Sequence, residues 1–398
     1  MSEAARTLRL RPGLAVVPGP PLRLWHSDSG QVEALSPAEV GPLLTAFVRP
    51  RPVADVLAGL EAGPANPDSA STVDLLERCV RAGLLVDGFD PAPTAVETLF
   101  AAPHRSLAEV LVDRPDVVVV GVPYDAGATS RPGSRFGPEA LRRASGTCFV
   151  YREDAGHPTG AWDPVAERQV LAGVRMADVG DLSEVAPVRN GVVLDRLRQT
   201  VGHLAANGSV PVALGGDHSI TLPVLTGLAK AHGPIGVIHV DAHADRGADP
   251  GVSWRVGVHH GNFLTWALRD QRITRLVQLG IRQREAVAPP PDPRVRVWPG
   301  TQAASVPLDE VLADLPEDLP WHVTLDVDAL DPSVLPATGT PVPGGFGVHE
   351  LAALLVGIAA QRRVVGVDVC ELMPGSDETA GLIPCELLVR MLAAALAP

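Results

Sequence analysis

Lysine, cysteine and aromatic residues are all scarce in this sequence. Lys230 is the only lysine among 398 residues, which excludes Schiff-base chemistry unless Lys230 performs it. The four cysteines lie far apart and form no Cys-x-x-Cys pair, so buried thiols in a reducing compartment are favoured over a zinc site or a disulfide framework. Because aromatic residues make up only 4% of the chain, its core must be mainly aliphatic.

Two other features are absent, a long apolar run and a positive net charge. No run approaches the length of a membrane span, and the N-terminus lacks the apolar stretch of a signal peptide, so we expect a cytoplasmic protein. The net charge of −13 argues against a nucleic-acid partner, because phosphates bind cationic surfaces. The length suits one large α/β domain and one small domain.

Residues 1–90 are predicted to form a small α+β domain that resembles a winged helix. Apolar runs predict strands over Leu14–Val17, Leu22–His26 and Leu84–Val86, and helices over Val53–Leu60 and Thr72–Ala82. The tetrad Ser36-Pro37-Ala38-Glu39 is a capping box with proline at the first helical position, so another helix should begin there. Residues 91–115 are expected to be a linker and lead-in.

The hydrophobicity pattern changes over residues 116–398, where short apolar runs alternate with helical segments. The runs are Val117–Val120, Val210–Leu214, Ile235–Val240, Leu276–Ile281, Trp321–Leu325 and Val364–Val367. Each run ends in a polar or glycine-rich cluster. This pattern predicts a parallel sheet covered on both faces. Ligands of such sheets bind beyond the carboxyl ends of the strands, where the polar clusters lie.

Aspartate and histidine residues follow three of these runs. The clusters are Asp217-His218, Asp241-Ala242-His243-Ala244-Asp245 and Asp326-Val327-Asp328. Taken singly, each could be no more than a helix cap or a solvated strand end. If the three strands are neighbours, two histidines (His218 and His243) and four carboxylates (Asp241, Asp245, Asp326 and Asp328) face one spot. Four close carboxylates repel one another without cations, so two divalent metal ions are favoured over one.

At these residues the chain resembles the ureohydrolases, the arginase and agmatinase family. Gly215–Ser219, Asp241–Asp245 and Asp326–Pro332 look like the three signatures of that family. Supporting matches are Gly121-Val122-Pro123, Arg131-Pro132-Gly133, Arg135-Phe136-Gly137-Pro138 and Gly339-Thr340-Pro341. The resemblance covers roughly residues 115–395. It implies a three-layer α/β/α sandwich around a mostly parallel sheet.

The resemblance also implies a ligand set and a reaction. His218 and Asp245 would bind one manganese ion, and His243 and Asp328 the other. Asp241 and Asp326 would bridge the two ions. Water activated by the ion pair would attack a guanidino carbon and release urea and a primary amine.

Three further residues receive roles from the resemblance. Glu371 matches the glutamate that binds the guanidinium group. His260 matches the proton shuttle of a His-Gly pair, a task that suits the pKa of histidine. The adjacent His259 leaves that choice open. Asp217 is expected to support the geometry of the ligands.

Three other polar residues are expected to serve the structure alone. His322 lies inside an apolar run, so a hydrogen-bonded core position is favoured over a ligand. Arg131 and Arg135 are expected to hold the first loop by bidentate contacts.

The chain differs from arginases at the side chains that bind the α-amino and α-carboxylate groups of free arginine. Those enzymes use an asparagine two residues after the Asp-x-His-x-Asp motif and a Ser-Gly-Asn run before the His-Gly pair. Here the positions hold Gly247 and Val256-Gly257-Val258, which disfavours free L-arginine. The long loop Arg246–Val258 also carries Arg246 and Arg255, which disfavour dicationic agmatine if they point inward.

The first 90 residues resemble winged-helix domains that bind leader peptides in enzymes that modify ribosomally made peptides. Such domains take a peptide as an added strand. With no lysine and more acidic residues than arginines, this segment disfavours DNA. A packing or oligomerisation appendage is the alternative, and a homo-oligomer is expected. The substrate is then either a small guanidino compound or an arginine side chain of a peptide, converted to ornithine.

Two other functions compete with a ureohydrolase. One is a deacetylase-like amidohydrolase with a single zinc ion, which the two-metal ligand set disfavours. The other is a non-catalytic binding protein on the same fold, which would have no reason to keep six costly polar residues at strand ends.

Overall fold

The structure is a computed structural model that forms two compact units. It describes residues 6–17, 23–26, 31–34, 40–61, 69–88, 97–182, 191–248, 251–300 and 302–397. The smaller unit comprises Met1–Val96 with Arg105–Arg114, and the larger comprises Glu97–His104 with Pro115–Pro398. The cysteines Cys79, Cys148, Cys370 and Cys385 are all free thiols. No helix among the described residues combines the length and apolarity needed to cross a membrane.

The smaller unit has the predicted α+β composition. Its strands are β1 (Thr7–Leu10), β2 (Leu14–Val17), β3 (Arg23–His26), β4 (Val32–Ala34), β5 (Arg51–Pro52) and β6 (Leu85–Asp87). They form two antiparallel sheets, β5-β1-β6 and β2-β3-β4. Its helices are α1 (Val40–Ala46), α2 (Val53–Glu61), α3 (Ser69–Arg81) and α4 (Leu107–Asp113). The predicted capping box at 36–39 lies outside the described residues.

The larger unit is built on an eight-stranded sheet in which every pairing is parallel. The strands in spatial order are β12 (Met176–Asp181), β7 (Val117–Val122), β13 (Val210–Gly215), β18 (Val364–Cys370), β17 (Trp321–Asp326), β14 (Ile235–Val240), β15 (Ile273–Ile281) and β16 (Val295–Pro299). The six predicted runs all form strands of this sheet. The strands β12 and β16 were not predicted.

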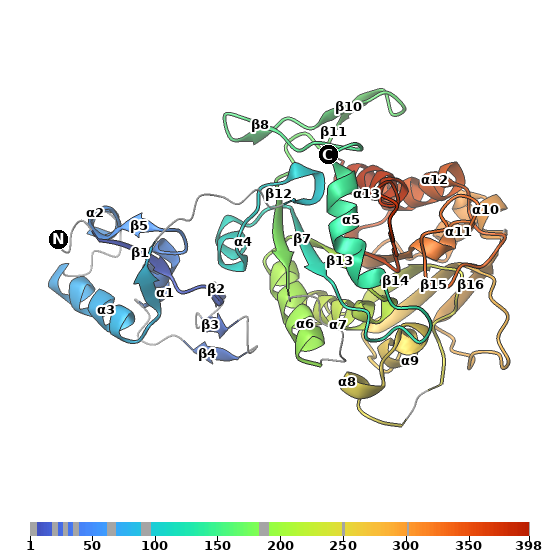
Figure 1. The fold of residues 1–398 in the computed structure, drawn as a ribbon, viewed down its shortest axis with the longest axis horizontal. Coiled ribbons are helices and arrows are strands. Elements are labelled where there is room, and N and C mark those ends of the chain that lie inside the picture. Colours follow the sequence, from blue (N-terminus) through green and yellow to red (C-terminus); the bar gives the residue numbers. More distant parts are fainter. Residues whose placement is uncertain are drawn as a thin grey trace. The chain divides into compact units, whose positions relative to one another are not determined.

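Helices cover both faces of the sheet, which confirms the predicted three layers (Figure 1). The longer ones are α5 (Gly137–Ser145), α6 (Gly191–Ala206), α7 (Thr221–His232), α12 (Val348–Ala359) and α13 (Leu382–Ala395). Shorter ones are α8 (Trp254–Gly257), α9 (Phe263–Ala267), α10 (Gln302–Ser305) and α11 (Leu308–Ala313). The chain moves along the sheet in one direction through α6 and α7, and in the other through α11 and α12. Right-handed crossovers therefore place these two pairs on opposite faces.

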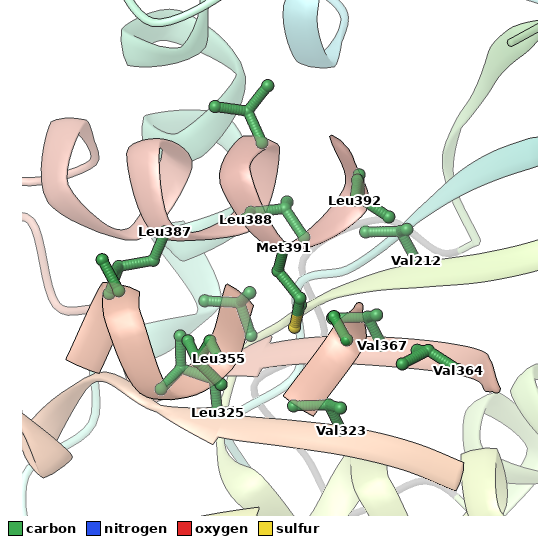
Figure 2. Close-up of a cluster of buried hydrophobic side chains, with 14 of the residues drawn as sticks. Val212, Val323, Leu325, Leu355, Val364, Val367, Leu387, Leu388, Met391 and Leu392 are labelled. Atoms are coloured by element: carbon green, nitrogen blue, oxygen red, sulfur yellow. The ribbon is translucent and has the colours of Figure 1, made fainter. Parts of the chain in front are cut away.

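The core is mainly aliphatic, as the composition predicted. In Figure 2, Leu387, Leu388, Met391 and Leu392 of α13 and Leu355 of α12 lie against Val212, Val323, Leu325, Val364 and Val367 of the sheet. Two ribbons, β8 (Glu153–Asp154) with β9 (His157–Pro158) and β10 (Ala161–Asp163) with β11 (Arg168–Val170), lie outside the sheet. The packed sheet is the rigid support for the segments that follow its strands.

Candidate metal centre

The order of the strands brings the predicted site segments together. The four central strands are β13, β18, β17 and β14, in that order. Asp217 and His218 follow β13, Glu371 follows β18, Asp328 follows β17, and the Asp241–Asp245 motif follows β14. Because parallel strands end at the same edge, all of these side chains meet beyond the middle of that edge.

His218 is the centre of a first donor group. Its Nδ1 atom lies 3.0 Å from Asp241 Oδ2, 3.3 Å from Asp245 Oδ2 and 3.2 Å from Asp326 Oδ2. The side chain of His218 is fully buried. Its other ring nitrogen, Nε2, lies 2.7 Å from the hydroxyl of Thr324, which fixes the orientation of the ring.

His243 is the centre of a second donor group. Its Nδ1 atom lies 3.0 Å from Asp328 Oδ2 and 3.2 Å from Asp241 Oδ1. Asp241 therefore presents one oxygen to each group. The backbone holds these carboxylates in place, because the Ala242 N–H donates to Asp328 at 3.1 Å and the His243 N–H donates to Asp241 at 2.6 Å.

The electrostatics of the centre call for added positive charge. Burial, and then the charges of Asp328 and Asp241, raise the pKa of Asp326 well above its usual range. Burial and Asp241 also raise the pKa of Asp328. Burial opposes the charging of His243, but hydrogen bonds to Asp241 and Asp328 raise its pKa to about 12.

Unpaired buried atoms show that the residues fit a divalent ion. His218 Nδ1 and Asp241 Oδ2 are buried and make no hydrogen bond of standard geometry to a described residue. The donor atoms of His218, Asp241 and Asp245 lie within 4.8 Å of one another, and so do those of Asp241, His243 and Asp328. Imidazole and carboxylate donors in this arrangement suit borderline divalent metals.

The backbone is strained at two positions of the centre. Asp245 has φ +48° and Glu371 has φ +65°, in the left-handed region that non-glycine residues rarely adopt. Such strain persists only where the surrounding structure imposes it, and it is concentrated at functional sites.

Glu371 lies beside the two donor groups and is 2% exposed. Its backbone N–H donates to the Gly216 carbonyl at 2.8 Å, and its Oε1 atom accepts the backbone N–H of His218 at 2.8 Å. The other oxygen, Oε2, faces Gly339, where an added Cβ atom would lie 3.8 Å away. One carboxylate oxygen is therefore anchored and the other is directed at the loop that follows Asp328.

His260 contacts Glu371, with 3.1 Å between Nδ1 and Oε1. Burial opposes charging of the ring, but Glu371 raises the pKa of His260 to about 9. The Nε2 atom lies 3.1 Å from the Thr129 backbone nitrogen and 2.7 Å from the Thr129 hydroxyl. Of the two adjacent histidines, His260 lines the cleft beside the donor groups.

Asp217 anchors the loop that carries Thr129. Its carboxylate is fully buried and accepts the N–H of Gly127 at 2.6 Å and that of Ser219 at 2.9 Å. Burial and the nearby Glu371 raise the pKa of Asp217 to about 7. Because the His260 N–H donates to the Gly127 carbonyl at 3.1 Å, Asp217 holds the loop against His260.

The two arginines of the first loop make the structural contacts predicted for them. Arg131 donates to the Gly339 carbonyl at 2.8 Å, which ties the loop to the segment after Asp328. Arg135 forms an ion pair with Asp125: its Nε atom donates to Oδ2 at 2.8 Å, and an η nitrogen lies 2.6 Å from Oδ1.

A buried polar chain behind His218 was missed by the sequence reading. Thr324, which contacts His218, donates to Asp368 Oδ1 at 2.5 Å. The second oxygen of Asp368 lies 2.8 Å from Nε2 of His322, which is therefore a partnered core histidine as predicted. Thr324 lies two residues before Asp326, and this spacing, which places both on one face of the strand, was the available signal.

A cleft of about 220 Å³ opens onto the donor groups. It is lined by Thr129, His243, Asp245, Gly247, His260, Gly261, Gln283, Glu285, Asp326 and Thr340. Arg246 and Arg255 are not among these residues. Arg246 donates to the Pro290 carbonyl, and Arg255 pairs with Asp195 at 2.6 Å. The expectation that these arginines disfavour a dicationic substrate was conditional on their pointing inward, and this condition is not met.

Comparison with known sequences identifies a matching family. The profile of the Arginase family matches residues 115–394. A mitochondrial agmatinase from Gallus gallus is 33% identical over 316 residues, which cover 76% of this chain and 87% of that protein. The proclavaminate amidinohydrolase of Streptomyces clavuligerus is 32% identical over 274 residues, covering 66% of this chain and 82% of that protein. A guanidinobutyrase from Pseudomonas aeruginosa is 30% identical over 312 residues, which cover 75% of this chain and 91% of that protein.

Comparison with solved structures agrees. The proclavaminate amidinohydrolase structure from Streptomyces clavuligerus has a TM-score of 0.63 at 27% identity, and the match covers 77% of this chain and 99% of that one. A hypothetical agmatinase from Burkholderia thailandensis has a TM-score of 0.62 at 27% identity, covering 77% and 91%.

Proposed function

Because the chain belongs to the arginase family and is a hydrolase of C–N bonds in linear amidines, we propose that it uses two manganese ions to convert a guanidino compound into urea and a primary amine. The observation that carries the proposal is the position of Asp241, which presents Oδ2 to His218 and Oδ1 to His243. A carboxylate placed between two donor groups is suited to bridging two ions.

The six predicted ligands divide between two ions. His218 and Asp245 would hold the first ion, and His243 and Asp328 would hold the second. Asp241 and Asp326 would contribute to both. For Asp241 this is supported by its two oxygens, one facing each Nδ1 atom, and by its full burial. Asp245 and Asp326 lie 3.3 and 3.2 Å from His218 Nδ1, and Asp328 lies 3.0 Å from His243 Nδ1, whereas the second role of Asp326 is what the family resemblance implies. When bound, two ions supply Lewis acidity that lowers the pKa of a water molecule towards neutrality.

The remaining residues bind the substrate and move protons. Glu371 accepts the N–H groups of the guanidinium on Oε2, because Oε1 is already engaged by His218 and His260. His260 gives a proton to the departing amine, a task that its protonated form performs. Asp217 positions the loop that holds His260 and does not touch the reacting atoms.

The geometry at Gly247 favours a substrate whose α-amino and α-carboxylate groups are not bound by the enzyme. At position 247, arginases carry an asparagine that binds the α groups of free arginine. In this chain a Cβ atom at that position would lie 2.7 Å from the Gly261 carbonyl oxygen. The Gly247 N–H also donates to that oxygen at 2.9 Å. No side chain fits there without moving backbone, so we propose a small guanidino compound or an arginine residue within a peptide, and not free L-arginine.

The smaller unit supports the peptide alternative. A hollow of about 450 Å³ lies between β1, α2 and α3 within this unit. Its walls are apolar, from Leu8, Val53, Leu57, Val73, Leu76 and Val80, and charged residues at its edge are Arg6, Glu77 and Arg81. We propose that this hollow takes a leader segment of a precursor peptide, which would bring an arginine side chain to the enzyme.

A urea-release assay with added manganese tests the function. The panel holds agmatine, 4-guanidinobutyrate, L-arginine and arginine-containing peptides, and mass spectrometry detects the loss of about 42 Da that marks guanidino hydrolysis. Turnover of a peptide or small guanidino compound without turnover of L-arginine is expected. A protein that binds two manganese ions but turns over nothing in the panel would contradict the proposal.

A further inference from the structure

His239 is a fully buried histidine that the ligand set above does not use. It lies on β14, two residues before Asp241, so both side chains project from the same face of the strand. Its Nε2 atom lies 2.8 Å from Asp241 Oδ2. Its ring packs against those of His218, at a centroid distance of 5.1 Å, and Phe263, at 5.8 Å, which are themselves 4.6 Å apart.

Gln278 fixes which nitrogen of His239 carries the proton. The amide Nε2 of Gln278 donates to the Ala244 carbonyl at 2.8 Å, so this end of the side chain must be the NH2 group. The same amide nitrogen lies 3.0 Å from His239 Nδ1 and has a second hydrogen to donate. Nδ1 is therefore the acceptor, and the proton of the neutral ring is on Nε2.

This tautomer decides between two roles for His239. The donor atoms of His218, His239, Asp241 and Asp245 all lie within 4.8 Å of one another, which by distance alone allows His239 to be a metal ligand. A ligand nitrogen must offer a lone pair, however, and Nε2 of His239 carries a hydrogen. The atom is therefore suited to donate to a carboxylate and not to bind an ion.

We propose that Gln278 and His239 form a positioning relay under the metal centre, in which His239 donates Nε2–H to Asp241 Oδ2. Neither atom has a hydrogen bond of standard geometry to a described residue, although both are buried and lie 2.8 Å apart. The relay holds the shared carboxylate in the orientation that serves both donor groups. It rests on the proposed two-metal function.

The relay is tested by metal binding to the full chain. His239→Gln keeps an N–H at the place of Nε2, and His239→Leu removes it at similar volume. Manganese affinity is measured by competition with a chromophoric chelator. His239→Leu should bind manganese about tenfold to 100-fold more weakly, the usual cost of losing a hydrogen bond to a metal ligand, and His239→Gln should stay within about threefold of wild type. His232→Gln, at the far end of α7, is the control.

A second measurement separates the relay from direct coordination. Visible absorption of the cobalt-loaded protein reports the atoms bound to the metal. The relay predicts the same band positions for wild type and His239→Gln. Gln278→Met removes the donor that keeps the proton of His239 on Nε2, so this variant should bind manganese more weakly although His239 is still present. A band shift in His239→Gln would make His239 a ligand and overturn the relay.

The outcomes also distinguish the relay from the function beneath it. Two ions bound equally well by wild type and His239→Leu, with both proteins folded by thermal unfolding, would overturn the relay alone. A wild-type protein that binds no divalent ion would overturn the two-metal function and the relay together.

Discussion

Glu371 Oε1 lies 3.1 Å from His260 Nδ1, although the two residues are 111 positions apart in the sequence. The same oxygen accepts the backbone N–H of His218. One carboxylate thus connects a predicted metal ligand, the predicted proton shuttle and the proposed guanidinium site. Glu371 makes this contact from a backbone with φ +65°, directly after the last residue of β18.

Replacing Glu371 by glutamine should remove the charge that binds guanidinium. The lost charge-assisted hydrogen bonds are worth about 1.5–3 kcal/mol, so kcat/KM should fall roughly 10-fold to 150-fold. Manganese content should be unchanged, because Glu371 contacts His218 only through the backbone. Glu378→Gln, an exposed carboxylate a few residues on, is the control and should match wild type. Equal kcat/KM for Glu371→Gln and wild type would argue against the assignment.

The pH dependence of turnover should report His260. Its pKa is raised to about 9, chiefly by Glu371 acting against burial. Because the protonated ring is the working form, kcat should fall as pH rises through about 9. In Glu371→Gln this alkaline limb should move to lower pH, and in His260→Asn it should disappear. A limb at the same pH in wild type and His260→Asn would assign it to another group.

The strands and the ligand types could be read from the sequence, but their convergence could not. The six apolar runs are almost entirely buried strands with little alternation, and such runs are easily recognised. The spatial order β13-β18-β17-β14 depends on crossovers that reverse direction after β16, which no local pattern records. The strand β12 was missed because Met176–Asp181 is half polar, and β16 because its residues are exposed at the sheet edge.

Residues behind the centre were missed for a different reason. His239 and Thr324 lie inside runs that were interpreted as apolar strands, and Asp368 directly follows such a run, so none of the three was singled out as a site residue. The directions of Arg246 and Arg255 depend on distant partners, Pro290 and Asp195. Only the folded chain shows that both arginines are engaged away from the cleft.

Removing the metal should destabilise the protein more at high pH than at low pH. Burial raises the pKa of Asp326 and Asp328 in the ion-free fold. Groups with a raised folded pKa favour folding at low pH, and this contribution is lost as pH rises through the folded pKa. Bound ions offset the cost of holding charged carboxylates in the buried site. At a free ion concentration 100 times Kd, binding adds about 2.7 kcal/mol to the free energy of unfolding. Thermal unfolding with manganese or with EDTA, at pH 6 and pH 8, should show the larger gap at pH 8. An equal gap would contradict this electrostatic account.

Asp331 should stabilise the loop after the last metal-ligand pair. It accepts the Ser333 hydroxyl at 2.6 Å, and backbone N–H groups of Ser333 at 3.0 Å, Gly344 at 2.7 Å and Gly345 at 3.1 Å. These bonds, the one from the Ser333 hydroxyl first, hold the pKa of Asp331 well below its usual range. A lowered folded pKa gives stability that is present above about pH 4 and lost as pH falls through the folded pKa. Asp331→Ala should lose about 1–2 kcal/mol of unfolding free energy at pH 7. The difference from wild type, measured by denaturant unfolding, should shrink below pH 4, and a constant difference would refute the pKa argument.

Position 247 should resist conversion of the enzyme to an arginase. Restoring the arginase residue by Gly247→Asn places a Cβ atom 2.7 Å from the Gly261 carbonyl oxygen, so the backbone beside His260 must shift. Overpacking of this kind costs about 1–3 kcal/mol, and Gly247→Ala should show most of the same loss because the Cβ atom alone causes it. Both variants should lose turnover of the panel compound that the wild-type enzyme hydrolyses, and neither should gain hydrolysis of L-arginine. Urea release at matched manganese content measures both. Gly247→Asn that hydrolyses L-arginine while Gly247→Ala does not would show that the missing amide, and not the closeness of the two loops, sets the substrate.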